Sequence, residues 1–263
     1  MPELAIIGSQ DVEASEWLDD AERIELPATD TSVPATIGRL NGCELIVMPR
    51  NSSGRPMPPH AIDYRTNIDA LARTGVRRVL TTAMVGTLRP SVPNGSMLLV
   101  DQFIDFTKDR QFTFFSDDHF GFADMTEPYC PSLRQQLLQA AGNISIALAP
   151  NGTYVGVPGP RFETRAEVRM YAQLGGDVIG HTGTTDCVMA REAGLCFATV
   201  AGVITLGAGL SDHQMNAELW HESRRTHAAR FRQIVAEMTR LLGDDHDNLR
   251  STCRCAAAAP IEK

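Results

Sequence analysis

Two short runs near the middle of the chain hold side chains that can bind a small anionic substrate. Arg161, Phe162 and Glu163 directly follow a rigid turn at Pro158–Pro160. A second polar run, 181–186, lies between an apolar segment and a segment with helical spacing. Where a strand ends beside a helix N-terminus, backbone N–H groups and the positive end of the helix favour an anion. The sequence therefore predicts a binding site within residues 151–209.

Short strands and helices must position these side chains. The apolar alternation at 155–157 predicts a strand before the turn. A helix is predicted to start near Thr164 and to end at Gly175, and residues 177–180 predict the next strand. We expect this helix to bury an apolar face made of Ala166, Met170 and Leu174.

The same alternation of strands and helices continues through the rest of the chain. Further strands are predicted at 4–8, 43–48, 76–85, 97–104 and 144–148. Further helices are predicted at 58–71, 132–141 and 216–242. The pattern indicates one α/β domain over residues 1–243, followed by a loose tail at 244–263.

Composition and charge exclude several classes of function. The 263 residues are 43% hydrophobic, which is enough for a full core, and the net charge is −8. Nucleic acids and anionic membranes attract clustered Lys and Arg, so neither is an expected partner. No apolar run approaches the roughly 18 residues of a membrane span, and the start of the chain lacks a signal-peptide pattern. We expect a cytoplasmic protein.

Other catalytic patterns do not occur in the sequence. The six cysteines are scattered, which favours reduced buried thiols. No metal-ligand cluster, no Gly-x-Gly-x-x-Gly fingerprint at a strand-to-helix turn and no Gly-x-Ser-x-Gly elbow is found. The Cys-x-Cys pair near the end of the chain leaves metal binding open as an alternative for those two residues.

Three runs carry a resemblance to a known family. Gly-Pro-Arg-Phe-Glu-Thr-Arg-Ala-Glu at 159–167, Asp-Val-Ile-Gly-x-Thr at 177–182 and Ala-Arg-Glu-Ala-Gly-Leu-Cys at 190–196 resemble the trimeric purine nucleoside phosphorylases and 5'-methylthioadenosine phosphorylases. The resemblance extends from about residue 4 to residue 242. It implies a single-domain, three-layer phosphorylase/hydrolase-like fold with a central mixed sheet flanked by helices. It also implies a homotrimer or a dimer of trimers, inorganic phosphate as co-substrate and no cofactor.

The resemblance assigns phosphate binding to Ser9, Arg50, Asn51, Ala83 and Thr182. An arginine can fork onto phosphate oxygens, and Asn51 stands where the family has a histidine. Only Gly8 and Ser9 remain of the family's glycine-rich phosphate loop, so an ordinary turn is the alternative there. A solvated loop arginine and a plain helix N-cap are the alternatives for Arg50 and Thr182.

The resemblance also implies contacts to the nucleoside. Phe162 is expected against the base, and Glu163 matches the carboxylate with which phosphorylases of 6-oxopurine specificity hold the ring edge. His181 and Met84 are expected beside the ribose. A carboxylate that only favours the start of a helix is the alternative for Glu163.

Two further positions concern the 5' end of the nucleoside and the assembly. Phe122 matches a residue that reaches into the pocket of a neighbouring subunit, and ordinary aromatic packing is the alternative. Asn216 stands near the family's 5'-hydroxyl-binding histidine. The cysteines Cys130, Cys196, Cys253 and Cys255 resemble the disulfide pattern of heat-stable archaeal members.

The largest departure from the family is at Thr205, where active members carry Asp or Asn to donate to the leaving base. A hydroxyl can donate but is a poor acid, and Gly207 replaces the carboxylate of methylthioadenosine phosphorylases. Loss of such a donor costs about a hundredfold or more in rate. The implied activity is phosphorolysis of a purine or modified nucleoside, possibly substituted at the 5' position, with Glu163 and Thr205 as catalytic residues. A phosphate-independent nucleosidase and a silent nucleoside-binding relative remain alternatives.

Overall fold

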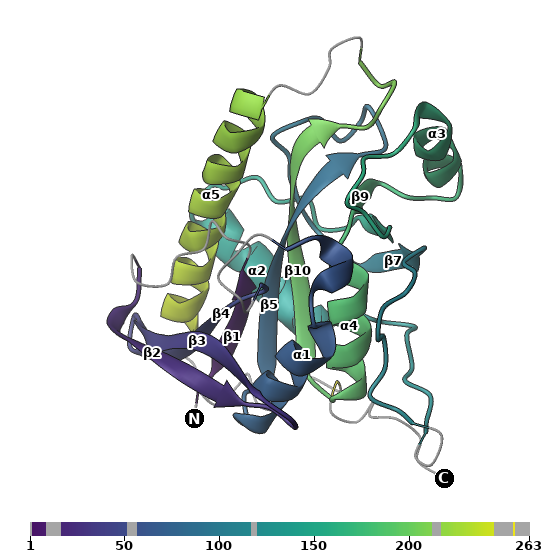
Figure 1. Ribbon diagram of the computed structural model, residues 1–263. Coiled ribbons are helices and arrows are strands. Elements are labelled where there is room, and N and C mark those ends of the chain that lie inside the picture. Colours follow the sequence, from purple (N-terminus) through teal and green to yellow (C-terminus); the bar gives the residue numbers. More distant parts are fainter. Residues whose placement is uncertain are drawn as a thin grey trace.

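A computed structural model describes residues 2–8, 17–51, 57–116, 120–211, 217–244 and 255. Strands and helices alternate along most of this chain (Figure 1). The strands are β1 (Leu4–Gly8), β2 (Asp19–Pro27), β3 (Ser32–Leu40), β4 (Cys43–Pro49), β5 (Arg78–Thr87), β6 (Met97–Leu99), β7 (Gln102–Asp105), β8 (Thr153–Gly156), β9 (Val178–Gly180) and β10 (Cys196–Leu206). The helices are η2 (Pro59–Ala61), α1 (Tyr64–Arg73), α2 (Pro131–Asn143), α3 (Arg165–Gln173), α4 (Gly183–Glu192) and α5 (Ala217–Asp244).

All the strands form one mixed 10-stranded sheet, as the sequence predicts. Its main path runs β2-β3-β4-β1-β5-β9-β8-β7, and β10 pairs with both β5 and β6. β1 and β10 lie parallel to β5, whereas β9 is antiparallel to it. β5 therefore pairs with β10 along one edge and with β1 and then β9 along the other.

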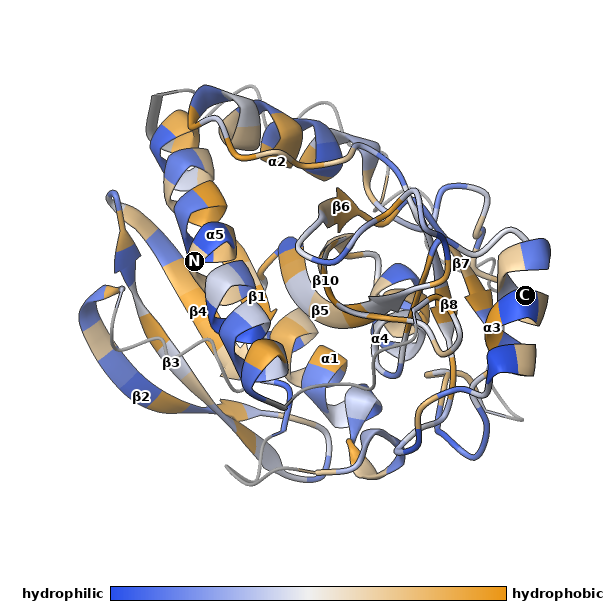
Figure 2. Cartoon of the chain, turned by 90° about the horizontal axis from the view of Figure 1, so that it is seen from above, coloured by the Kyte–Doolittle hydropathy of each residue, from blue (hydrophilic) through white to orange (hydrophobic). Residues whose placement is uncertain are grey.

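Helices cover both faces of this sheet and make three layers (Figure 2). On one face, side chains of α1 and α4 pack with strand residues that include Ala5, Val79 and Ala83. On the other face, α2 and α5 pack against strand residues that include Leu4 and Leu80. Because alternate residues of β1 and β5 point to opposite faces, both strands are apolar throughout. The predicted α/β class and three-layer architecture are confirmed.

The structure differs from the sequence predictions at several elements. Residues 144–148 form no strand, and 97–104 divides into β6 and β7. The antiparallel β2–β3 hairpin was not predicted. α3 buries Val168 and Tyr171 instead of the predicted face, of which Met170 is 42% exposed and Leu174 is 52% exposed. Both faces of α3 are apolar in sequence, and packing against β8 and β9 selects the Val168 face.

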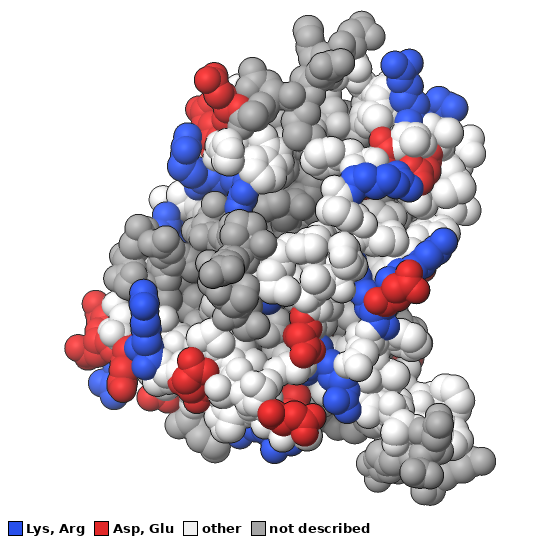
Figure 3. Space-filling model, in the orientation of Figure 1, with Lys and Arg blue, Asp and Glu red and all other residues white. Residues whose placement is uncertain are grey.

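Acidic and basic side chains are interspersed on the face that Figure 3 presents. Among the described helices, none combines the length and the apolar character that crossing a membrane requires.

Candidate active site

The candidate site lies beside β5, at a gap between two strands that end facing each other. β1 pairs with residues 79–81 of β5, and β9 pairs with residues 86–87. Because the two strands run in opposite directions, Gly8 at the end of β1 and Gly180 at the end of β9 both lead into this gap. Residues 82–85 of β5 form its floor. The sequence predicted neighbouring parallel strand ends here, and the antiparallel direction of β9 corrects that prediction.

Arg50 is the buried cation of this gap. Its backbone N–H donates to the carbonyl oxygen of Gly8 at 2.9 Å, so it lies at the end of β1. Its Nε donates to Oδ2 of Asp186 at 3.1 Å, and its Nη2 donates to the Thr81 hydroxyl and to the Thr82 carbonyl. No described residue accepts from Nη1. Arg50 is only 6% exposed, so the alternative of a solvated loop arginine is wrong.

Asp186 is the fixed countercharge of Arg50. It is fully buried in the first turns of α4, and its Oδ1 has no hydrogen-bond partner among the described residues. Burial raises the pKa of this carboxyl group, and the Arg50 guanidinium opposes that rise. The pair orients the guanidinium. The sequence carried one signal for it, because Thr182 and Asp186 stand four residues apart at the start of a predicted helix and therefore share a face.

The N-terminus of α4 presents Thr182 to the gap. The Thr182 side chain caps no backbone N–H of α4, so its hydroxyl is not used as a helix cap. The N–H groups of Thr182 and Gly183 donate to the buried Tyr154 hydroxyl at 3.2 Å and 3.3 Å. The prediction that the first amides of this helix converge on an anion is therefore wrong for these two groups. The Thr182 group that can still bind a ligand is its side-chain hydroxyl.

His181 and Glu163 form the second part of the site. Nε2 of His181 lies 3.8 Å from Oε1 of Glu163, and the two side chains are 19% and 9% exposed. Burial, and next the charge of Arg110, lower the pKa of His181 to about 4. Burial raises the pKa of Glu163. At neutral pH the imidazole is uncharged, so this contact is a polar contact and not an ion pair.

The turn at 158–160 packs directly on the imidazole ring. Gly159 has φ +63°, and a Cβ atom there would lie 2.6 Å from Nδ1 of His181. A side chain at this position would displace the ring, which explains the glycine. After the turn, Arg161 pairs with Glu167 at 2.6 Å, inside the first turn of α3. The predicted start of this helix at Thr164 is confirmed by its capping box.

Arg110 links the two parts of the site, and sequence reasoning did not find it. Its Nη2 donates to the Pro158 carbonyl at 2.9 Å and its Nη1 donates to the Thr185 hydroxyl at 3.4 Å. Its guanidinium carbon lies over the Tyr64 ring, 5.2 Å from the centroid. Arg110 therefore ties the turn above His181 to α4. It stands in an irregular segment, where no periodicity marks a functional side chain.

The two β5 residues of the predicted site point in opposite directions. Alternation along the strand places Ala83 on the face of Thr81, whose hydroxyl Arg50 contacts. Met84 is half-buried and points to the other face. The structure therefore brings Ala83, but not Met84, to the face on which Arg50 lies.

Thr205 lies at the end of β10, opposite Gly86 of β5. A β-bulge between Val203 and Thr205 shifts the register there, and such bulges re-aim side chains next to functional sites. Thr205 is half-buried, and its hydroxyl donates to the Leu206 carbonyl at 3.3 Å in an exposed hydrogen bond. A Cβ atom at Gly207 would lie 2.6 Å from the Thr87 carbonyl oxygen, so this backbone leaves no room for the carboxylate of methylthioadenosine phosphorylases.

Three of the predicted residues are half-buried or exposed, and two more lie outside the described residues. Asn51 is half-buried in the bend after Arg50. Phe162 and Phe122 are 59% and 75% exposed. Ser9 and Asn216 lie outside the described residues, as do residues 212–214, which the sequence suggests as a gate.

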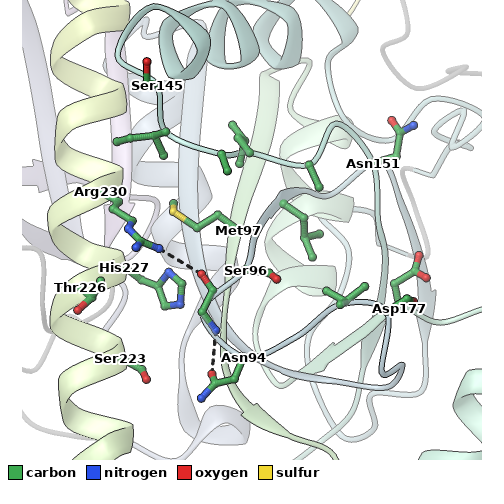
Figure 4. A pocket seen from close by; sticks show the side chains of 18 of the residues that line it. Asn94, Ser96, Met97, Ser145, Asn151, Asp177, Ser223, Thr226, His227 and Arg230 are labelled. Atoms are coloured by element: carbon green, nitrogen blue, oxygen red, sulfur yellow. Dashed lines mark hydrogen bonds between the residues drawn. The ribbon is translucent and has the colours of Figure 1, made fainter.

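A separate cavity of 1220 Å³ lies between α5, the segment before β6 and the segment after α2 (Figure 4). Arg230 extends from α5 to donate to the Gly95 carbonyl at 3.1 Å, and His227 lies one turn away on the same helix. None of the predicted site residues lines this cavity. The predicted site residues that the structure describes therefore lie outside this cavity.

Comparison with known proteins agrees with this geometry. A family model described as the phosphorylase superfamily matches residues 3–240. The 6-oxopurine nucleoside phosphorylase of Pyrococcus furiosus is 40% identical over 223 residues, which cover 82% of this chain and 83% of that relative. The S-methyl-5'-thioadenosine phosphorylase of the same organism is 37% identical over 203 residues, covering 77% and 79%.

A solved structure supports the same assignment. The methylthioadenosine phosphorylase from an antarctic soil metagenomic library is 28% identical and superposes with a TM-score of 0.90, covering 99% of this chain and 92% of that chain. Sequence identity and fold thus agree over most of the chain. The chain belongs to the phosphorylase superfamily and, within it, to the purine nucleoside and methylthioadenosine phosphorylases.

Proposed function

We propose that this protein cleaves the N-glycosidic bond of a purine nucleoside with inorganic phosphate, giving free base and sugar 1-phosphate. The observation that carries the proposal is the buried Arg50, held by Asp186 with its Nη1 left without a described partner. A guanidinium oriented in this way is preorganised for one phosphate oxygen before the substrate arrives. The Thr182 hydroxyl, which caps no N–H of α4, is proposed as a second donor.

In this mechanism a phosphate oxygen attacks the anomeric carbon while the bond to the base breaks. The sugar carries oxocarbenium charge in the transition state, and the base leaves with the bonding electrons. No covalent enzyme intermediate forms, so catalysis depends on positioning and electrostatics. The neutral His181 beside Glu163 fits a hydrogen bond to ribose or base and does not add a positive charge next to the oxocarbenium ion.

The proposed base is a 6-oxopurine. Its ring N1 carries a hydrogen, which the Glu163 carboxylate can accept, whereas N1 of adenine is itself an acceptor. Glu163 is only 9% exposed, so such a hydrogen bond is well shielded from water. Thr205 is proposed to donate to the imidazole part of the leaving base. Because a hydroxyl is a weak acid, turnover is expected to be slower than in relatives with Asp or Asn.

The proposal includes assembly and surroundings. We propose a homotrimer, or a dimer of trimers, in which the exposed Phe122 covers the 5' end of a nucleoside bound to a neighbouring subunit. A 75% exposed aromatic ring is a reasonable interface residue. The protein is expected to act in the cytoplasm, with phosphate as co-substrate and without a cofactor.

Inosine, adenosine and methylthioadenosine, each with and without phosphate, test the proposal. Phosphate-dependent release of hypoxanthine from inosine, faster than release of adenine from the other two, is the expected result. Equal release without phosphate would identify a nucleosidase. Nucleoside binding with no release of base under any condition would identify a silent binding protein.

A further inference from the structure

The two ring nitrogens of His181 lie in different surroundings. Nδ1 is buried and has no hydrogen-bond partner among the described residues. The turn at 158–160 packs on this side of the ring, because a Cβ atom at Gly159 would lie 2.6 Å from Nδ1. Nε2 lies 3.8 Å from Oε1 of Glu163. The ring therefore presents Nδ1 to the turn and Nε2 to the carboxyl group of the site.

Arg110 holds a buried donor beside the same turn. Its Nη2 donates to the Pro158 carbonyl at 2.9 Å, and its Nη1 donates to the Thr185 hydroxyl at 3.4 Å. One face of its guanidinium stacks on the Tyr64 ring, 5.2 Å from the centroid. Its Nε is buried and has no partner among the described residues. A guanidinium held at both Nη atoms and on one face keeps this Nε–H inside the protein.

The unpaired donor and the unpaired acceptor are complementary. A guanidinium only donates hydrogen bonds, whereas a neutral imidazole has one nitrogen that accepts. Leaving either group buried without a partner costs about 1–3 kcal/mol. One water molecule that accepts from Nε of Arg110 and donates to Nδ1 of His181 satisfies both groups. The turn at 158–160 therefore brings together a matched pair, and that pair requires a lone pair on Nδ1.

The charges around the ring favour the same state. Burial, and next the charge of Arg110, lower the pKa of His181 to about 4, so the ring is neutral at pH 7 and carries one hydrogen. A nearby cation favours a lone pair on the nitrogen that faces it. The acidic neighbours do not oppose this, because Glu163 is on the Nε2 side and Asp186 of α4 is paired with Arg50. The hydrogen therefore belongs on Nε2.

We propose that Arg110 is a positioning residue that fixes His181 in the tautomer with its hydrogen on Nε2. In this tautomer Nε2 donates to an acceptor atom of the bound nucleoside, on the side of the ring where Glu163 accepts. Without Arg110 the hydrogen can move to Nδ1, and Nε2 then meets the substrate as an acceptor. The contact with the nucleoside rests on the proposed phosphorolysis, whereas the tautomer does not.

Nitrogen magnetic resonance of the chain carrying isotope-labelled histidine measures the tautomer directly. The chain has seven histidines, and the signals of His181 are those missing from His181→Gln. At pH 7, Nδ1 of His181 is expected to be unprotonated and Nε2 to be protonated. In Arg110→Met the two tautomers are expected to mix. The pKa of the ring should also rise by about one unit or more in this variant, because a neighbouring positive charge is removed.

Arg65→Met is the matched control for Arg110→Met. Arg65 also stacks on an aromatic ring, with its guanidinium carbon 5.4 Å from the centroid of Phe114, but it belongs to α1 and not to the candidate site. The control removes the same charge and the same side-chain type. The ring signals of His181 should remain those of wild type in it. Circular dichroism of both variants checks that the domain is folded.

Two substitutions of His181 separate the roles of its two nitrogens in a kinetic assay. The longer side chain of glutamine places its amide nitrogen near the position of Nε2, whereas the amide nitrogen of asparagine lies near the position of Nδ1. His181→Gln should therefore keep the KM for inosine within about twofold of wild type, and His181→Asn should raise it about three- to tenfold, the worth of one hydrogen bond. The KM for phosphate should stay within about twofold of wild type in both chains.

Three results would overturn the proposal. The first is a wild-type His181 that carries its hydrogen on Nδ1 or is charged at pH 7. The second is a folded Arg110→Met chain in which the tautomer and the pKa of His181 are those of wild type. The third is a smaller rise of the KM for inosine in His181→Asn than in His181→Gln. If wild type releases no base from any nucleoside, the proposed phosphorolysis fails, and the magnetic resonance result alone decides the tautomer.

Discussion

Replacing Arg50 by leucine removes the buried cation of the candidate active site. The resulting loss of folding stability can be calculated from the structure. Asp186 is fully buried and its Oδ2 accepts from Nε of Arg50 at 3.1 Å. Removing one partner of a buried ion pair costs about 3–5 kcal/mol, because the other charge stays buried without compensation. For a chain of this size that lowers Tm by about 6–20 °C.

The carboxyl group can escape part of this cost by taking up a proton. Burial already raises the pKa of Asp186 above its usual range, and the loss of Arg50 removes the opposing effect. A carboxyl group with a raised pKa in the folded state contributes stability at low pH, which is lost as pH rises through that pKa. The destabilisation in Arg50→Leu should therefore be larger at pH 8 than at pH 5.

Thermal unfolding and phosphorolysis are compared in wild type and three variants, so that an effect on stability can be distinguished from an effect on activity. Arg50→Leu should unfold far below wild type, and the double variant Arg50→Leu/Asp186→Asn should recover at least half of the loss. Arg73→Leu is the control, because its ion pair with Asp69 lies at the surface and is worth no more than about 1 kcal/mol. Phosphorolysis should be absent from both Arg50 variants and normal in Arg73→Leu.

Two outcomes would refute this reasoning. If Arg50→Leu unfolds at the wild-type temperature, the buried pair does not hold the site together. If the double variant regains stability and also phosphate-dependent activity, Arg50 does not bind the anion.

Three further predictions concern single side chains of the site. The pKa of His181 is about 4 in the folded chain, against about 6.5 when unfolded, so its contribution to stability is present above pH 6.5 and is lost toward pH 4. Between pH 6.5 and pH 4, the free energy of unfolding measured in urea should fall by up to about 3 kcal/mol more in wild type than in His181→Asn. Equal decreases in the two chains would contradict the lowered pKa of His181. Glu163→Ala removes a hydrogen bond to a charged group, worth about 1.5–3 kcal/mol, so kcat/KM for inosine should fall about ten- to a hundredfold while that for methylthioadenosine changes less. Thr205→Asn supplies a better donor to the leaving base, and single-turnover rates should rise at least about tenfold; an unchanged or lower rate would remove Thr205 from this role.

Local signals predicted the elements around the site well. The turn at 158–160, the capping residue Thr164 and the glycine stop at 175 each act within a few residues, and all lie where the sequence indicates. The strand at 4–8 and the helix at 216–242 also match, because long apolar patterns have one dominant period.

Long-range choices could not be predicted in the same way. The buried face of α3 depends on Val155 and Ile179 of other strands, and neither face of the helix is polar enough to decide it locally. The reversed direction of β9 depends on pairing with β5, a partner some 90 residues away in sequence. Asp186 and Arg110 acquire their importance only from the contacts that the fold gives them.

Phosphorus magnetic resonance of a reaction with inosine tests the central claim most directly. The account predicts a new phosphate-ester signal from ribose 1-phosphate that grows in equal amount with hypoxanthine and is absent in the Arg50→Leu/Asp186→Asn chain. Hypoxanthine that accumulates with no ester signal would mean that water, and not phosphate, accepts the sugar, and the account of Arg50 as the phosphate anchor would be wrong.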